Sequence, residues 1–435
     1  MKTLLKNAAI VVMDGKENLK VIERGFLGIK DDTIDYVGEA EPSGYYDTVK
    51  DMEGTVLMPG LINAHGHGPM NMLRGVGTGL PLQEWLDIIF KYEAVMTPED
   101  IYAGQLWACY EMIKTGTTTV VEMYDFPWTA GRAIKKSGMK GHICRVGLSF
   151  SEDQEIPPNR FDECVDLVKN WSDPTGRVKA DFCIHAEYTN KLSFLKKIAK
   201  INRELGANVN IHLSETVREN KECLERHGIT PAEFFLRAGI FDGRVYAAHC
   251  VHLTDNDKKI LKDKNVTVVN NPSSNAMLGS GIAEIRDLLD RGINVALGTD
   301  GSDSNNNLDM FEEMHVCALV QKAANMNPAV IRAEEVIKMA TINGARACGR
   351  TDTGAIQTGK KADIIAVSLE GPHMYPTGNI IDLLVYSAQG SDVVMTMVDG
   401  NILYENGKCT TIDIDEAKAL LGEAVDHLYK DVKLD

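Results

Sequence analysis

The long middle of this chain repeats one pattern, a short apolar run followed by an amphipathic stretch. The amphipathic stretches include FDECVDLVKNW and KLSFLKKIAKINREL, which are typical of helices that pack on one face. Buried strands that alternate with helices indicate a parallel sheet, and eight such units predict an α/β fold, a (β/α)8 TIM barrel. The eight apolar runs are TVLMPGLINAHGH, GTTTVVEMY, GHICRVGLSF, VKADFCIHAEY, NVNIHLSET, RVYAAHCV, VTVVNNPSS and NVALGTDG.

The two chain ends differ from this middle. Both alternate short apolar runs with glycine turns, and Asp399-Gly400 lies between two such runs. Val, Ile and Tyr at a period of two indicate antiparallel strands, and Asp-Gly is typical of a hairpin. We therefore predict three segments, which are 1–55 as the first part of a small β-sandwich, 56–352 as the metal-dependent barrel, and 353–435 as the second part of the sandwich with a C-terminal helix at 414–431.

The charge of the chain restricts its partners. It has 46 Lys and Arg against 62 Asp and Glu, a formal charge of −16, which argues against nucleic acid or an anionic membrane as the main partner. The nine cysteines are scattered without a CxxC, as expected for free thiols in a reducing compartment. No run is long enough for a signal peptide or a membrane helix. We expect a cytoplasmic protein whose partner is a small molecule.

The histidines fall at particular places in the strand pattern. Of eleven, five lie at or just after the carboxyl end of a predicted strand, where barrels place their catalytic groups. In His65-Gly66-His67 the two imidazoles point the same way, since residues i and i+2 of a strand share a face. A bare HxH is more often a pair of core residues, so the argument rests on the whole set. That set is His65, His67, His185, His212 and His249, with Asp300 at the end of the last strand.

Longer stretches resemble a known family. They are MPGLINAHGHGPMNMLRGVGTGLPLQEWL, KTGTTTVVEMY, IHLSETVRENKECLERHG, AAHCVHLTDND, VVNNPSSNAMLGSGIAEI and LGTDGSDSNNNLDMFEEM. The chain resembles the amidohydrolase superfamily and, within it, the methylthioadenosine/S-adenosylhomocysteine deaminases. The resemblance runs from about residue 55 to 350, and the flanks fit the small β-sandwich of that family.

The resemblance implies a metal centre and two catalytic side chains. A single divalent metal, usually Zn²⁺ with Fe²⁺ as the alternative, would be held by His65, His67, His212 and Asp300. Glu215 would shuttle a proton and His249 would orient the attacking water. His185 stands where binuclear relatives carry a bridging carboxylated lysine, which favours one metal over two.

The resemblance also implies contacts to substrate. Glu93 matches a ligand of the ribose hydroxyls, although one residue is deleted between Trp85 and it. Arg145 and His185 match residues that contact substrate, and an ordinary salt bridge is the alternative for Arg145. The chain departs from the family at Glu187, which would add a carboxylate near the pocket, and at Ser302-Asp303.

The function that follows is metal-dependent hydrolytic deamination of an adenosine-type nucleoside: S-adenosylhomocysteine, 5′-methylthioadenosine or adenosine. Metal-bound hydroxide would attack C6 with Asp300 as proton acceptor, Glu215 would protonate N1, and ammonia would leave the inosine-type product. The alternatives are another heterocycle on the same scaffold, such as guanine, 8-oxoguanine, a pterin or a triazine, and a catalytically inactive assembly scaffold. Oligomers are common in the family, so the resemblance also allows a homo-oligomer.

Overall fold

The computed structural model of the protein describes residues 1–15, 17–149 and 160–432. One of its two nine-stranded sheets is parallel and runs in the order β13-β12-β11-β10-β9-β8-β7-β6-β14. The strands are β6 (Leu61–His67), β7 (Thr117–Tyr124), β8 (Lys140–Gly147), β9 (Val178–Ile184), β10 (Val209–Leu213), β11 (Val245–His249), β12 (Thr267–Asn270), β13 (Val295–Leu297) and β14 (Asp300–Gly301).

The parallel sheet closes on itself. Only Gly298 and Thr299 separate β13 from β14, so these two segments are halves of one last strand. β14 pairs with β6, the first strand, with Asp300 opposite Gly66 and Gly301 opposite His67. This closure confirms the predicted barrel and brings the ends of the first and last strands together.

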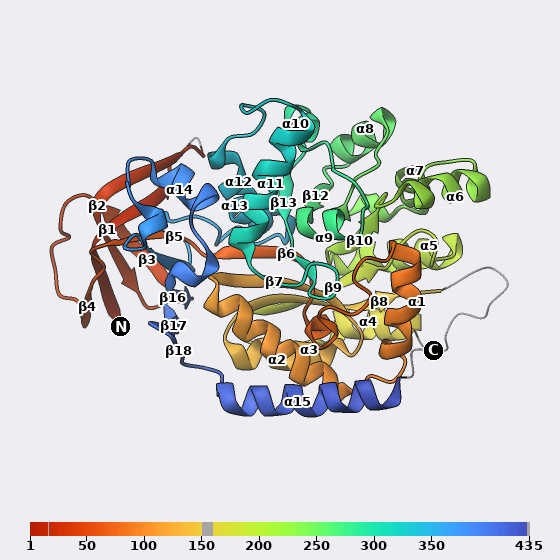
Figure 1. Ribbon diagram of the computed structural model, residues 1–435, viewed down its shortest axis with the longest axis horizontal. Helices are drawn as coiled ribbons and strands as arrows, with labels where there is room; N and C mark the ends of the chain where they lie inside the picture. The colour runs from red at the N-terminus through yellow and green to blue at the C-terminus, as the bar shows by residue number, and fades with distance from the viewer. Residues whose placement is uncertain (16, 150–159, 433–435) are drawn as a thin grey trace.

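Helices surround the barrel (Figure 1). Those of the barrel units are α2 (Pro98–Lys114), α3 (Pro127–Ser137), α4 (Arg160–Asn170), α5 (Leu192–Leu205), α6 (Val217–His227), α7 (Pro231–Ala238), α8 (Asp255–Asp263), α9 (Pro272–Met277), α10 (Ile285–Asp290), α11 (Met310–Ala324), α12 (Ala333–Ala340) and α13 (Ile342–Ala347). The connection from β6 to β7 also holds η1 (Gly68–Leu73) and α1 (Leu82–Glu93). In the described part of the chain, no helix has the length and apolar character needed to cross a membrane.

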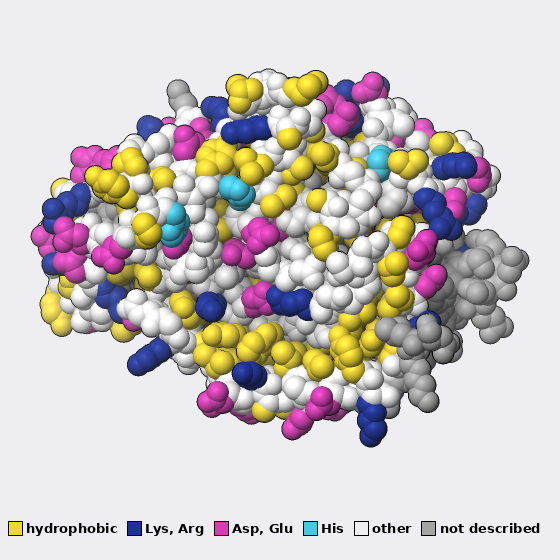
Figure 2. Space-filling view, in the orientation of Figure 1, with side chains coloured by type: hydrophobic (Ala, Val, Ile, Leu, Met, Phe, Trp, Pro, Cys, Tyr) yellow, Lys and Arg dark blue, Asp and Glu magenta, His cyan; other side chains and the backbone are white. Residues whose placement is uncertain are grey.

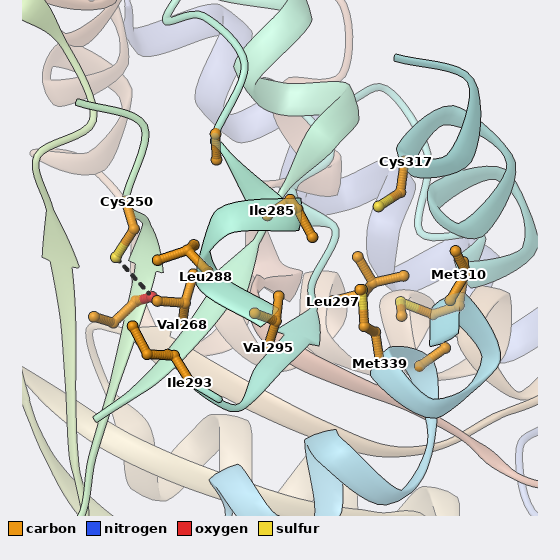
Figure 3. Close-up of a cluster of buried hydrophobic side chains, with 14 of the residues drawn as sticks. Cys250, Val268, Ile285, Leu288, Ile293, Val295, Leu297, Met310, Cys317 and Met339 are labelled. Carbon is orange, nitrogen blue, oxygen red and sulfur yellow. Dashed lines mark hydrogen bonds between the residues drawn. The ribbon is translucent and has the colours of Figure 1, made fainter. Parts of the chain in front are cut away.

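Alternate positions of the barrel strands face two different cores. Val268, Val295 and Leu297 point outward and pack against the helices, as Figure 3 shows. Val269 and Ala296, their neighbours in the chain, belong to a separate cluster inside the barrel. This alternation follows from the period of two in a strand and explains why the runs are apolar throughout. Burying each such side chain contributes about 1.5–3 kcal/mol to stability.

The second sheet is built from both chain ends. Its strands follow the order β18-β17-β16-β15-β5-β1-β2-β3, and β4 pairs with β1. Side chains from distant strands of this path, such as Ile34 and Met397, share one core, so the sheet folds over on itself. Its strands are β1 (Lys2–Met13), β2 (Leu19–Lys30), β3 (Thr33–Gly38), β4 (Thr48–Asp51), β5 (Thr55–Pro59), β15 (Ile364–Ser368), β16 (Val393–Val398), β17 (Asn401–Glu405) and β18 (Lys408–Cys409).

Apart from η2, which lies between α7 and β11 of the barrel, the remaining elements belong to the C-terminal part of the chain. The helix α15 (Ile414–Asp431) crosses under the barrel and packs on α2, at the bottom of Figure 1. The others are α14 (Ile380–Tyr386) and the short 3-10 helices η2 (Ile240–Asp242), η3 (Pro372–Met374) and η4 (Gly390–Asp392). The chain therefore returns from the terminal sheet to the barrel before it ends.

Candidate active site

Four side chains meet at the carboxyl end of the barrel. His65 and His67 come from β6, His212 from β10 and Asp300 from β14. One ligand atom of each lies within 4.8 Å of the corresponding atom of every other. The parallel strands place these residues together because their carboxyl ends all open on the same rim.

Hydrogen bonds to main-chain carbonyls fix the tautomer of two of these imidazoles. The Nδ1–H of His67 donates to the carbonyl of Met123 over 2.6 Å, and the Nδ1–H of His212 donates to the carbonyl of His185 over 2.7 Å. In a neutral imidazole the other nitrogen, Nε2, then carries a lone pair. Those lone pairs face the centre, and the Nε2 atoms of His65 and His212 are 3.2 Å apart.

Asp300 presents one carboxylate oxygen to the centre and anchors the other. Its Oδ1 is 3.3 Å from Nε2 of His65 and 3.1 Å from Nε2 of His67. Its Oδ2 accepts hydrogen bonds from the hydroxyls of Ser274, at 2.6 Å, and Ser304, at 3.1 Å. The sequence argument did not assign either serine a role, although both lie in the stretches that resemble the family.

The donor set fits a divalent cation. Three imidazole nitrogens and one carboxylate oxygen are ligands that zinc takes in catalytic sites. Burial lowers the pKa of His65 to about 4 and holds that of His212 well below its usual range, which favours the neutral ligand form. For His67 burial also opposes the charge, but the hydrogen bond to Asp300 and the charges of Asp300 and Glu122 together outweigh it and raise the pKa to about 9. A cation held by these residues would displace that proton.

Glu215 and His249 stand beside the four ligand atoms. Oε1 of Glu215 accepts a hydrogen bond from the hydroxyl of Ser280 at 2.9 Å, and its Oε2 is 3.9 Å from Nε2 of His249. Nδ1 of His249 donates to Oδ1 of Asn275 at 2.9 Å, which turns Nε2 toward the centre. Burial raises the pKa of Glu215. Burial lowers the pKa of His249, but the charges of Glu215 and Asp300 outweigh this effect and raise it overall.

The turn that carries Glu215 is held by a carboxylate that the sequence argument did not single out. Glu219, in the first turn of α6, accepts hydrogen bonds from the backbone N–H groups of Ser214 at 3.0 Å and Glu215 at 2.7 Å. Ser214 has a φ of +50°, a strained value for a residue other than glycine. The sequence offers one signal for this role: Glu219 lies four residues after Glu215, which was already predicted to be catalytic.

A cavity of about 800 Å³, counting its open mouth, leads from this centre to the surface. Its polar wall includes Glu93, His185 and Tyr188 together with the residues of the centre. Its apolar wall comes mainly from α1 in the insertion after β6. The α1 side chains on the cavity are Leu82, Trp85, Leu86, Ile89 and Phe90.

Glu93 lies at the end of α1, with its carboxylate at the cavity. Burial raises its pKa to about 7, a hydrogen bond with Tyr124 lowers it, and the nearby charge of Asp125 raises it. The structure therefore brings this predicted substrate ligand to the same cavity as the four ligand atoms, despite the deletion that precedes it in the sequence.

Two other predicted or suspected pocket residues lie elsewhere. The guanidinium of Arg145 is outside the described cavity wall and is bound to the carboxylates of Asp125 and Glu163. Glu187 points to α6, where it pairs with Arg226 at 2.7 Å and His227 at 2.9 Å. Both side chains form ion pairs, and the spacing of residues along the sequence does not reveal these partners.

Comparison with known proteins places this geometry in context. A sequence model of the amidohydrolase family matches residues 56–403. The chain is 42% identical over 424 residues to the 5-methylthioadenosine/S-adenosylhomocysteine deaminase of Acetivibrio thermocellus, covering 96% of this chain and 97% of that one. It is 41% identical to the 5'-deoxyadenosine deaminase of Methanosarcina mazei, with 97% and 98% covered.

A solved structure is also similar. The crystal structure of an adenosine deaminase from Xanthomonas campestris with bound zinc superposes with a TM-score of 0.92 at 29% identity. The match covers 98% of each chain. The likeness therefore includes the terminal sheet as well as the barrel.

Proposed function

Because the chain belongs to the amidohydrolase family, we propose that it is a metal-dependent hydrolytic deaminase of adenosine-type nucleosides. It would convert 5′-methylthioadenosine, S-adenosylhomocysteine or adenosine to the inosine-type product and ammonia. The observation that carries this proposal is the convergence of three imidazole nitrogens and a carboxylate oxygen at one end of a nucleoside-sized cavity that also holds Glu93. The names of the relatives agree with it.

The metal would be held by His65, His67, His212 and Asp300. Zinc suits a set of three imidazoles and one carboxylate, and Fe²⁺ is the alternative. A bound divalent cation would lower the pKa of a coordinated water to about 7 and so supply a nucleophile at neutral pH.

The protein's own groups would then move the protons. The carboxylate of Asp300 can accept the proton of the attacking water, since Ser274 and Ser304 hold it in place. Glu215, which burial keeps protonated to a higher pH, can donate to N1 of the ring as C6 is attacked. The imidazole of His249, when protonated, would direct the N–H of Nε2 at the attacking oxygen, since Nδ1 is bound to Asn275. His185, on the cavity wall, would contact the heterocycle.

Glu93 would hold the sugar. An ionised carboxylate accepts hydrogen bonds from both vicinal hydroxyls of a ribose, and a free base offers neither. This role separates the proposal from its alternative, a deaminase of guanine, 8-oxoguanine, a pterin or a triazine. Glu93→Ala should therefore reduce kcat/KM for a nucleoside by at least about tenfold, and equal losses on a nucleoside and a free base would contradict the role.

A substrate panel tests the function directly. Purified protein, expressed with sufficient zinc, is assayed for ammonia release from S-adenosylhomocysteine, methylthioadenosine, adenosine, adenine, guanine and 8-oxoguanine. We expect the nucleosides to react and the free bases to react poorly. Activity on the free bases alone would contradict the proposed ribose-binding role of Glu93. No activity on any of these compounds, with one metal bound, would overturn the proposed function.

The compartment is inferred from the thiols. All nine cysteines are free, and eight of them are buried. Free thiols persist in a reducing compartment, so we propose that the enzyme works in the cytoplasm on a small nucleoside.

A further inference from the structure

We propose that Asp125 decides which 5′ substituents the enzyme accepts, favouring neutral or cationic groups and disfavouring a carboxylate. This inference rests on the proposed function, because it concerns the far end of the nucleoside whose base would lie at the metal centre.

Asp125 lies where the 5′ end of a nucleoside would be. It follows directly after β7, lines the cavity, and its side chain is 41% exposed. Glu93 lines the same cavity. If Glu93 holds the 2′ and 3′ hydroxyls, a substituent that extends from the 5′ carbon of the same ribose can reach Asp125.

Two arginines behind Asp125 are already neutralised. Arg145 and Arg160 both donate from Nη1 to Oδ1 of Asp125, with a distance of 3.0 Å for Arg160. Nε of Arg145 also donates to Glu163 at 2.7 Å. The side chains of the two arginines are only 13% and 12% exposed, so Asp125 stands between them and the cavity.

No cation is left on the described cavity wall. Among the described residues that line it, the charged groups apart from the histidines are the carboxylates of Glu93, Asp125, Glu215 and Asp300. A substrate carboxylate would meet like charge here, or would have to displace Asp125 from both arginines.

The remaining wall suits an apolar or cationic group. The apolar side chains of α1 run along the cavity next to Glu93, as expected around a thioether or a methyl group. A primary amine could pair with the exposed carboxylate of Asp125. Uncharged 5′ groups and amines therefore fit this wall better than a group that carries a carboxylate, so S-adenosylhomocysteine would be a poorer substrate than its uncharged or aminated counterparts.

Two substrates that differ only by one carboxylate test this inference. They are S-adenosylhomocysteine and its decarboxylated analogue, 5′-S-(3-aminopropyl)-5′-thioadenosine. In the wild-type enzyme we expect kcat/KM for the analogue to exceed that for S-adenosylhomocysteine by about tenfold or more. Asp125→Asn removes the competing charge and frees both arginines, so this ratio should fall by about tenfold.

The matched control is Glu163→Gln. It removes a carboxylate from the same arginine cluster, but Asp125 stays between the arginines and the cavity, so the ratio should stay within about twofold. If the wild-type kcat/KM for S-adenosylhomocysteine equals or exceeds that for the decarboxylated analogue, the inference is overturned before any variant is made. A ratio that Asp125→Asn leaves unchanged would also overturn it. Failure of methylthioadenosine to react at all would instead identify the proposed function as wrong.

Discussion

At the residue scale, the two oxygens of Asp300 have separate partners. Oδ1 faces His65 and His67, and Oδ2 is held by Ser274 and Ser304. A carboxylate fixed in this way can act as a metal ligand and as a proton acceptor without turning. The same division occurs at His67 and His212, where Nδ1 donates to a backbone carbonyl and Nε2 faces the centre.

Asp300→Asn should abolish most turnover while the fold is kept. The amide supplies a weaker ligand and cannot accept the proton, so we expect kcat/KM to fall by at least about 100-fold. Ser304→Ala, which removes one hydrogen bond to Oδ2, is the control and should cost about tenfold or less. Ammonia release measures the activity, and circular dichroism checks the fold. Near-normal turnover by Asp300→Asn would exclude Asp300 from the mechanism.

Glu93 predicts a pH dependence of substrate binding. Burial raises its pKa to about 7, so the acid is protonated below that pH and ionised above it. The ionised form accepts hydrogen bonds from both ribose hydroxyls, so KM for methylthioadenosine should rise several-fold from about pH 8 to about pH 6. Glu93→Gln should flatten this profile. A KM profile that is the same in both proteins would assign the dependence to another group.

At the element scale, the turn from β10 into α6 shapes the site. Glu219 belongs to the first turn of a helix that Thr216 caps, and it accepts two backbone N–H groups from the strained turn before it. A helix start is a usual place for such a carboxylate. Here the same carboxylate positions Glu215.

Glu219→Gln should therefore affect catalysis more than binding. An amide accepts these N–H groups less strongly than a carboxylate, so Glu215 would lose part of its orientation. We expect kcat to fall by about tenfold with KM nearly unchanged. Glu222→Gln, in an exposed pair with Arg218 on the same helix, is the matched control and should leave both parameters unchanged. A parallel rise of KM in Glu219→Gln would indicate a general loss of the pocket.

At the scale of the whole molecule, buried ion pairs join the barrel to the terminal sheet. Nζ of Lys140, in β8, is 2.6 Å from Asp363 and 2.8 Å from Asp399. The side chains of Lys140 and Asp363 are only 4% and 1% exposed. Lys140 is the first residue of β8, at the opposite end of that strand from the catalytic rim, so these pairs serve the assembly of the two parts.

Lys140→Met should lower the free energy of unfolding by about 3 kcal/mol, because it removes the lysine that pairs with the buried carboxylate of Asp363, whereas Asp399 keeps Arg177 as a partner. KM for the nucleoside should stay as it is. Lys135→Met removes a half-exposed lysine that is 3.6 Å from Asp173, and it should cost less than about 1 kcal/mol. Denaturant unfolding of both variants measures the difference. Equal losses of unfolding free energy in the two variants would show that the buried pair contributes no more to stability than the more exposed one.

The sequence alone determined the barrel and the residues at its rim. The apolar runs predict the strands. A parallel sheet brings the carboxyl ends of its strands to one side, regardless of the conformation of the connecting loops. His65, His67, His212 and Asp300 could therefore be expected to meet, because their positions along the strands already fixed their direction. His249 followed in the same way, because it also ends a predicted strand, whereas the role of Glu215 was implied by the resemblance to the family.

Only the tertiary structure decided how the side chains around the rim pair. Asp125, Arg145 and Arg160 come from three elements, and nothing in their spacing shows that one carboxylate neutralises two arginines. Glu187 likewise turns to α6 rather than to the cavity. Periodicity gives the face on which a residue lies, but the partner of a charged side chain depends on packing between elements far apart in the sequence. The preference for a 5′ substituent is settled by such pairings.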